Sequence, residues 1–367
     1  MTDEVLIEKR DGLGVITLDR PRAINALNHP MVRAVLAALR AWADDDEVRV
    51  VVLTGSGERG LCAGGDLVGM YTDAKDRVGG ADSPSGQFWR DEYTLNALIA
   101  DYPKPYVAIM DGLVLGGGVG VSAHGSHRVV TERSSIGMPE TGIGFVPDVG
   151  GTRLLSRAPG EIGTHLGLTA GRMAAGDAIA AGFADHYVPS DRLPALLAAL
   201  AGTDVEVAIA KFAEAAPASA LLAQREWIDA CYTGDDVEEI VHRLQAHPVP
   251  EARQAAADIL AKSPVAVKVT LRALRSARGD ATLADTLNRE FRVSVAGLRS
   301  HDLGEGIRAQ VIDKDRAPQW LPPALGDVSA ELVDSYFLGL GDGELGLVDS
   351  GASAIVTTVR TRSEEQS

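Results

Sequence analysis

Two carboxylates stand on one loop-forming stretch of the sequence, downstream of a triple glycine. Glu140 and Asp148 lie within residues 138–151, a run punctuated by glycine and proline, and the triple glycine occupies residues 116–118. Glycine lets main-chain N–H groups approach and hold a developing oxyanion. A carboxylate beside such donors can attack an acyl carbon or activate water to do so. The pattern therefore predicts acyl chemistry.

Two glycine-rich loops are placed to supply the N–H donors. Residues 61–67 (LCAGGDL) follow an apolar stretch, and residues 112–120 follow another and open a helix. An isolated pair of glycines usually only makes a turn. At a helix start, however, free N–H groups point outward with the helix dipole behind them. We expect the two loops to converge on one carbonyl oxygen.

A rival interpretation of the second loop is a dinucleotide site. Residues 118–123 (GVGVSA) satisfy the loose glycine fingerprint. The fingerprint also needs an acidic residue at the end of the next strand, about 20 positions on. That strand runs instead into Glu132-Arg133, so we set this interpretation aside.

The composition limits what else the chain binds. It has 367 residues, 46% of them hydrophobic, and a formal net charge of −16. That field repels nucleic acid and anionic lipid, so we expect neither as a partner. Cys62 and Cys231 are too few for a disulfide framework and lack metal-site spacing. With no apolar segment of membrane-spanning length, we expect a cytoplasmic protein.

The elements that must position these residues alternate between strand and helix. Asp11-Gly12 favours a tight hairpin turn between apolar strands. Asn28 is placed to cap a helix with apolar residues at helical spacing. The expected order after the hairpin is a helix from 29, a strand at 49–53, a helix at 88–99, a strand at 106–110, a helix from 117 and a strand at 128–131. This order predicts α/β layering.

The second half of the chain has helical patterning. Ser263-Pro264 and Thr282 each have the form of a helix start. We expect a catalytic core over residues 1–192, a helical region over 193–325 and a partly flexible extension over 326–367. The Gly-, Ser- and Pro-containing stretch from Met70 to Gln87 favours a flexible lid.

Taken together, the motifs resemble the enoyl-CoA hydratase/isomerase (crotonase) superfamily, most closely its 3-hydroxyisobutyryl-CoA hydrolase branch. The resemblance spans about Leu13 to Pro322. It rests on residues 18–27 (LDRPRAINAL), Cys62–Asp66 (CAGGD), the triple glycine, Pro139-Glu140, and the C-terminal stretches 301–309 and 318–320. The resemblance implies a spiral core of ββα units with a C-terminal α-helical region.

The resemblance also implies roles for individual residues. The N–H groups of Gly65 and Gly117 would form the oxyanion hole, and Glu140 would act as nucleophile or as general base. Asp148 and Glu92 would join Gly117 and Glu140 in binding the substrate. The residues expected to contact coenzyme A are Arg22, Ala23, Ala63 and Gly65.

One departure from the family pattern bears on the reaction. Where hydratases of the superfamily carry a first glutamate, this chain has Gly120, which cannot transfer a proton. Asp148 and Glu92 instead match the hydrolase branch. The resemblance thus implies hydrolysis of a short branched β-hydroxyacyl-CoA, namely 3-hydroxyisobutyryl-CoA in valine breakdown, without metal or redox cofactor. Turnover of an enoyl-CoA by a hydratase or isomerase and non-catalytic acyl-CoA binding stay open, as does assembly into trimers or hexamers.

Each assignment has a structural alternative. Asp148 precedes a helix and can serve as its N-cap. Arg22 can be a solvated surface charge, and Glu92 can lie on a solvated helix face. His301 fits a capping or surface position, so we leave it out of the site.

Overall fold

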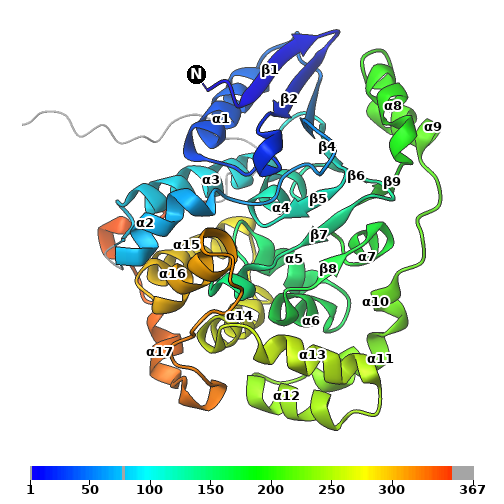
Figure 1. Cartoon of the computed structure of the whole chain (residues 1–367). Helices are drawn as coiled ribbons and strands as arrows, with labels where there is room; N and C mark the ends of the chain where they lie inside the picture. The colour runs from blue at the N-terminus through cyan, green and yellow to red at the C-terminus, as the bar shows by residue number, and fades with distance from the viewer. Residues whose placement is uncertain (1, 77–78, 349–367) are drawn as a thin grey trace, which may run out of the picture.

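A six-stranded sheet forms the upper part of the computed structural model, which describes residues 2–76 and 79–348 (Figure 1). Its strand order is β1-β2-β3-β4-β6-β9. β1 runs antiparallel to β2, and all other neighbours are parallel. The strands are β1 (Val5–Arg10), β2 (Leu13–Leu18), β3 (Val50–Gly55), β4 (Tyr106–Met110), β6 (His127–Val130) and β9 (His186–Tyr187).

A second, three-stranded sheet carries the glycine loop. Its order is β5 (Leu113–Leu115), β7 (Ser135–Gly137) and β8 (Arg172–Met173). The chain passes from β4 to β5 to α4 (Gly117–Ser122), and again from β6 to β7, so that two strands and a helix repeat as a unit. This arrangement confirms the predicted α/β layering and places the triple glycine directly after β5.

Seventeen α-helices are found among the described residues. They are α1 (His29–Ala43), α2 (Leu67–Asp76), α3 (Pro84–Ala100), α4, α5 (Gly151–Arg157), α6 (Ile162–Thr169), α7 (Ala175–Ala180), α8 (Leu193–Leu200), α9 (Val205–Phe212), α10 (Ala220–Ala223), α11 (Arg225–Cys231), α12 (Val237–Ala246), α13 (Pro250–Leu260), α14 (Pro264–Ala277), α15 (Leu283–Leu298), α16 (His301–Ile307) and α17 (Ala330–Ser335). None of these has both the length and the apolar character needed to cross a bilayer.

The predicted helix starts are confirmed by their caps. The side chain of Asn28 accepts a hydrogen bond from Met31 N, and that of Ser263 accepts from Ala266 N. Thr282 forms a capping box with Asp285. Each cap satisfies N–H groups that the first helical turn leaves free.

Two predictions from the sequence are wrong, namely the first residue of one helix and the loop expected before it. α3 begins at Pro84, capped by Ser83, rather than at residue 88. The expected lid over Met70–Gln87 is mostly helical, because residues 70–76 belong to α2 and residues 84–87 to α3. Of the expected C-terminal extension, residues 349–367 lie outside the described residues.

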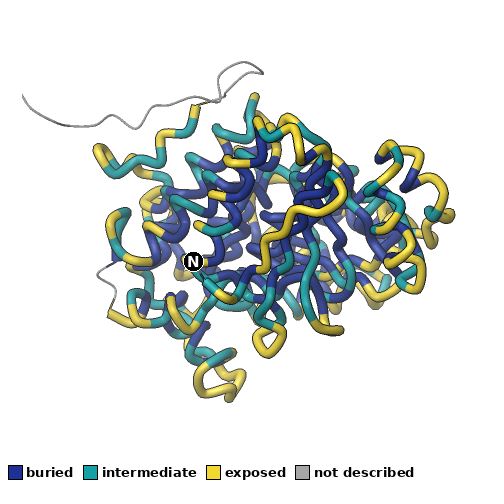
Figure 2. Tube along the Cα trace, turned by 90° about the horizontal axis from the view of Figure 1, so that it is seen from above, coloured by how far each residue is buried: buried dark blue, intermediate teal, exposed yellow. Residues whose placement is uncertain are grey.

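The main hydrophobic core is shared by both halves of the chain. Buried residues of β2, α1 and α3 lie in one cluster with Leu271 of α14 and Phe291 of α15. The other face of the large sheet is covered by α8 and α9, which stand at one edge of the molecule in Figure 1. Figure 2 shows that the buried residues lie together in the interior of the molecule, with exposed loops around them. The division at residue 193 stays a prediction, since helices beyond it complete the core of the first half.

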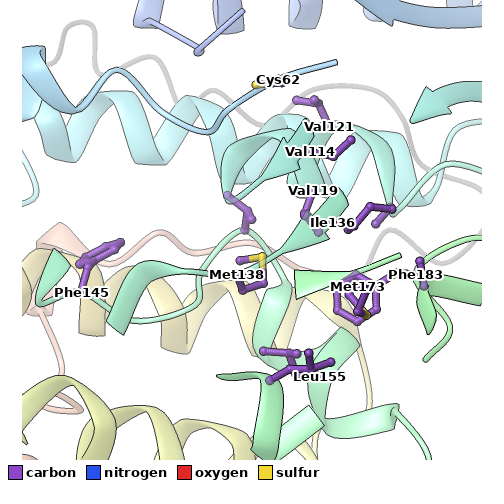
Figure 3. Close-up of a cluster of buried hydrophobic side chains, with 14 of the residues drawn as sticks. Cys62, Val114, Val119, Val121, Ile136, Met138, Phe145, Leu155, Met173 and Phe183 are labelled. Atoms are coloured by element: carbon purple, nitrogen blue, oxygen red, sulfur yellow. The ribbon is translucent and has the colours of Figure 1, made fainter. Parts of the chain in front are cut away.

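An apolar platform lies next to the glycine helix. Val114 of β5, Val119 and Val121 of α4, Ile136 of β7, and Met138 are all buried and point into one cluster (Figure 3). Close packing on this platform restrains the first turn of α4. The direction of the N–H groups at residues 116–118 is therefore set by the core.

Candidate active site

The two glycine loops lie side by side, as expected from the sequence. Leu115 N donates to Cys62 O at 2.9 Å, which joins the loops side by side. A Cβ built on Gly117 would lie 3.5 Å from the main-chain N of Gly65. Within the described part of the chain, neither the Gly65 N–H nor the Gly117 N–H donates to a protein acceptor. Two unused donors thus lie close together at the start of α4.

Glu140 lies beside these donors. It opens the 3₁₀ helix Glu140–Ile143, it is buried, and its Oε1 lies 2.7 Å from the position of a Cβ on Gly116. Its Oε2 is buried and has no hydrogen-bond partner among the described residues. A buried carboxylate oxygen without a partner is costly, which makes Glu140 a candidate for a functional role.

Glu92 provides a second carboxyl group at the same place. It projects from α3 and is only 2% exposed, so the solvated-face alternative is wrong. Its Oε1 lies 2.6 Å from the position of a Cβ on Gly117 and likewise has no partner among the described residues. Gly116 and Gly117 therefore lie between two carboxyl groups, and a side chain at either position would displace one of them.

Asp148 is held by a side chain that the sequence did not single out. The Tyr93 hydroxyl donates to Asp148 Oδ2 at 2.8 Å and lies 2.8 Å from the hydroxyl of Ser294 on α15. All three side chains are buried. The helical second half of the chain therefore takes part in orienting a predicted site residue.

The N-cap alternative for Asp148 is wrong, because a different acid holds the start of α5. Glu290 of α15 accepts from Gly150 N at 2.6 Å, from Thr152 N at 2.9 Å and from Thr152 Oγ1 at 2.5 Å. The Asp148 side chain makes no cap bond to α5. Its carboxylate is thus available to other donors.

Burial is the main cause of the shifted pKa values of these three acids. It raises the pKa of Glu140 and of Glu92 well above the ordinary value, and the charge of Asp148 raises both further. Burial raises the pKa of Asp148 to about 7, although the Tyr93 hydrogen bond opposes the rise. Carboxyl groups with pKa values near the working pH are suited to proton transfer.

These groups open into one cavity of about 640 Å³. Gly65, Gly117, Glu92, Glu140 and Asp148 all line it, and so does Ala63 from the predicted coenzyme A set. Part of its apolar wall is formed by Trp89 and Phe145, whose rings stack with centroids 5.3 Å apart. A pocket of this size, with apolar walls and carboxyl groups at one place, fits a small acyl group and its linker.

Position 120 is closed to a carboxylate. A Cβ on Gly120 would lie 2.7 Å from Val149 Cβ and 2.9 Å from Asn96 Nδ2. Both neighbours are buried, and Val149 has a φ of 53°. A glutamate at this position would have to displace the core.

The structure does not bring Arg22 and Ala23 to the cavity. Both are exposed in the 3₁₀ helix Pro21–Ala23 and are absent from the cavity lining. Their role in binding coenzyme A stays a prediction.

Sequence reasoning missed Tyr93, Ser294 and Glu290. Tyr93 adjoins Glu92. Ser294 and Glu290 lie more than 100 positions beyond their partners Tyr93 and Gly150, and no local pattern marks them. Among the described residues no group of His, Cys, Asp or Glu could hold a metal ion.

A family model and curated proteins of one name are similar to this chain over most of its length. The family model described as Enoyl-CoA hydratase/isomerase matches residues 13–337. The chain is 40% identical to "3-hydroxyisobutyryl-CoA hydrolase, mitochondrial" of Rattus norvegicus over 94% of this chain and 91% of that protein. It is 39% identical to the protein of the same name from Gallus gallus, with the same coverage.

Solved structures share the fold over nearly the whole chain. A carnitinyl-CoA dehydratase from Mycobacterium thermoresistibile is 52% identical, with a TM-score of 0.89, over 94% of this chain and 98% of that one. An enoyl-CoA hydratase from Rhodobacter sphaeroides 2.4.1 is 44% identical, with a TM-score of 0.88, over 94% and 100%. The crotonase-like core with a C-terminal helical region is thereby confirmed.

Proposed function

The chain belongs to the enoyl-CoA hydratase/isomerase family, and we propose that it hydrolyses 3-hydroxyisobutyryl-CoA to 3-hydroxyisobutyrate and coenzyme A. The curated hydrolases of that name resemble it along more than nine-tenths of its length. The observation that carries the choice of hydrolysis is position 120. Two-glutamate hydration needs a carboxylate there, and Val149 and Asn96 occupy the space.

Catalysis on this proposal begins with polarisation of the thioester. The carbonyl oxygen accepts hydrogen bonds from the N–H groups of Gly65 and Gly117, which are free to donate. A preorganised donor of this kind lowers the barrier by about 3 kcal/mol. The negative charge that develops on the oxygen is thus stabilised without reorganisation of the site.

Glu140 supplies the reacting oxygen. As nucleophile, its carboxylate attacks the carbonyl carbon, the carbon–sulfur bond breaks, and the thiolate takes up a proton to leave as coenzyme A. Water then cleaves the mixed anhydride, which frees the acid and regenerates Glu140. As general base, Glu140 instead takes a proton from water that attacks the same carbon. Its unpartnered Oε2 is compatible with either route.

Asp148 and Glu92 complete the substrate site. The Asp148 carboxylate, oriented by Tyr93, retains acceptor capacity for the hydroxyl of the acyl group. Burial and the charge of Asp148 raise the pKa of Glu92, and in its protonated form Glu92 can donate a hydrogen bond to that hydroxyl or to water. The pair would select a β-hydroxyacyl group over an unsubstituted one.

A second candidate is hydration or dehydration of an acyl-CoA. The two solved structures at 44–52% identity are named as a dehydratase and a hydratase. Glu92, facing Gly117 from α3, is a second carboxyl group beside Glu140 and could replace the missing one as proton donor.

One paired assay separates the candidates. The protein is incubated with 3-hydroxyisobutyryl-CoA and with crotonyl-CoA, and thiol release and loss of the enoyl absorbance are followed in parallel. Hydrolysis predicts thiol release from the first substrate and no loss of enoyl absorbance with the second. Loss of the enoyl absorbance without thiol would overturn the proposal in favour of a hydratase. Binding without either signal would make the protein a non-catalytic acyl-CoA binder.

The remaining expectations stay proposals. We propose no metal or redox cofactor, because a thioester is already activated towards attack. A role in valine catabolism, a trimeric or hexameric assembly and a cytoplasmic location are also proposals. The curated relatives are named as mitochondrial, so cell fractionation is the measurement that decides location.

A further inference from the structure

The main chain directly after Asp148 has an unfavourable conformation. Val149 has a φ of 53° and Gly150 a φ of 80°. Glycine adopts a positive φ without steric cost, whereas for a β-branched residue such as valine it is a genuine outlier. Val149 is fully buried, and its Cβ lies 2.7 Å from the position of a Cβ on Gly120. Strained backbone of this kind persists only where its surroundings enforce it, and it clusters at functional sites.

Two side chains from distant elements hold the strained turn. His124 Nε2 lies 2.7 Å from Val149 O, and Glu290 Oε2 accepts from Gly150 N at 2.6 Å. The imidazole lies directly against the turn, because a Cβ on Gly150 would be 2.6 Å from both Cε1 and Nε2 of His124. The Val149 carbonyl and the Gly150 N–H belong to the same peptide group. His124 and Glu290 therefore bind the two polar ends of one peptide.

The hydrogen bond to Val149 fixes the chemical form of His124. A carbonyl oxygen only accepts hydrogen bonds, so Nε2 carries a proton and donates it. Burial, aided by the charges of Arg128 and Arg153, lowers the pKa of His124 to about 4, although the bond to Val149 opposes the change. Near neutral pH the side chain is thus a neutral imidazole with its proton on Nε2.

His124 also connects the turn to the oxyanion donors. α4 begins at Gly117, whose N–H is one of those donors, and His124 follows Ala123, the C-cap of the same helix. All the residues of α4 are buried, so close packing restrains the helix. One short helix therefore has a donor for the thioester carbonyl at its start and is followed directly by a donor for the turn after Asp148.

We propose that His124 is a positioning residue that makes the site selective for an acyl group with a hydroxyl. By holding the Val149 carbonyl, it keeps the preceding residue, Asp148, where its carboxylate accepts the hydrogen bond of that hydroxyl. Tyr93 orients the same carboxylate through its side chain. The inference rests on the proposed function, which supplies the hydroxylated substrate. The described residues that line the cavity do not include His124, so it acts on the substrate through Asp148.

The test measures the binding of two thioesters that differ by one hydroxyl. The affinities for 3-hydroxyisobutyryl-CoA and for isobutyryl-CoA are measured by calorimetry in a Glu140→Gln parent, to suppress turnover. His124→Asn and His124→Gln are then compared. The amide of glutamine reaches the place of Nε2 and can donate to Val149 O, whereas the amide of asparagine ends near Nδ1 and cannot. His242→Asn, at an exposed position on α12, is the matched control.

His124→Asn is expected to weaken binding of the hydroxylated thioester about ten-fold and to leave the affinity for isobutyryl-CoA unchanged. His124→Gln and His242→Asn should retain the ratio of the two affinities found in the parent. An equal loss for both thioesters, or an unchanged ratio in His124→Asn, would overturn the proposal. A glutamine variant that behaves like the asparagine variant would also overturn it.

Nitrogen-15 NMR of the wild-type protein tests the bond to Val149 without any substitution. The His124 imidazole should be neutral, with its proton on Nε2, throughout the range from about pH 6 to 8. A proton on Nδ1 with a bare Nε2 would overturn the proposal.

Thiol release from 3-hydroxyisobutyryl-CoA separates this inference from the reaction assignment. A protein that releases no thiol, yet loses its preference for the hydroxylated thioester in His124→Asn, would retain the positioning role and lose the hydrolase assignment. A protein that hydrolyses the thioester but binds both thioesters equally well would keep the hydrolase assignment and lose the positioning role.

Discussion

The Tyr93 hydroxyl donates a 2.8 Å hydrogen bond to Oδ2 of Asp148 across 55 residues of chain. Both side chains are buried, and this bond opposes the rise that burial causes in the pKa of Asp148. A tyrosine on α3 thereby keeps the carboxylate of a distant loop ionisable near neutral pH.

Replacement of Tyr93 by phenylalanine should shift the pH profile of activity. Without the hydroxyl, the pKa of Asp148 rises above its value of about 7. Protonated Asp148 accepts the substrate hydroxyl's hydrogen bond more weakly than the carboxylate does, so the acid limb of kcat/KM should move upward by about 0.5–1 pH unit. Tyr102→Phe is the control, since Tyr102 donates to Leu39 O away from the cavity. Identical acid limbs in the two variants would contradict the assigned role.

Glu140→Gln should abolish most hydrolysis while leaving binding intact. The amide retains the shape of the side chain but can neither attack the thioester nor accept a proton from water. We expect kcat to fall by about 10²–10⁴-fold with little change in KM, measured by thiol release. Hydrolysis at the wild-type rate would remove Glu140 from the mechanism.

Gly117→Ala should damage the oxyanion hole. The added Cβ would lie 2.6 Å from Glu92 Oε1, so either the carboxyl group or the loop must move. Displacement of one donor is expected to lower kcat by about 10²-fold. Gly69→Ala is the matched control, because nothing lies within 4 Å of its added Cβ. Full activity in both variants would argue against the Gly117 amide as a donor.

Asp148→Asn should stabilise the protein at alkaline pH while impairing catalysis. The folded-state pKa of about 7 lies above the usual value of an unfolded aspartate. The folded wild type therefore binds a proton that the unfolded chain has lost, and its stability falls as the pH rises from about 4 to 7. The Asp148→Asn variant has no such loss. The free energy of unfolding of the variant minus that of the wild type should therefore be about 2–4 kcal/mol larger at pH 8 than at pH 4.

Urea unfolding of both proteins at the two pH values measures this difference. An advantage that does not change with pH would mean that Asp148 is not the titrating group.

Glu290→Gln should loosen the start of α5. The carboxylate accepts three hydrogen bonds from Gly150 and Thr152. Glutamine keeps one acceptor oxygen and turns an NH₂ group towards a buried N–H donor. We expect a loss of about 1–3 kcal/mol in the free energy of unfolding. Glu226→Gln, at an exposed position on α11, provides a control for the change in charge; equal effects of the two substitutions would deny Glu290 its capping role.

Features that depend on residues close together in the sequence could be predicted from it. Asn28, Ser263 and Thr282 start helices because each side chain accepts a hydrogen bond from the N–H group three residues ahead. The strand at 106–110 was placed correctly, and the glycine loops with Glu140 were recognised by residue type and spacing. The start of α3 was missed because its small and polar first turn, with Pro84, also has the composition of a loop.

By itself the sequence determined most helix starts and turns and marked the candidate site residues, because caps, turns and apolar periodicity act over a few positions. The tertiary structure alone decided how those residues are used. Tyr93 meets Ser294 across 201 positions and Glu290 meets Gly150 across 140. The acids acquire raised pKa values only when packing removes their water. Burial and contacts between distant segments exist only in the folded chain, so no local sequence pattern can predict them.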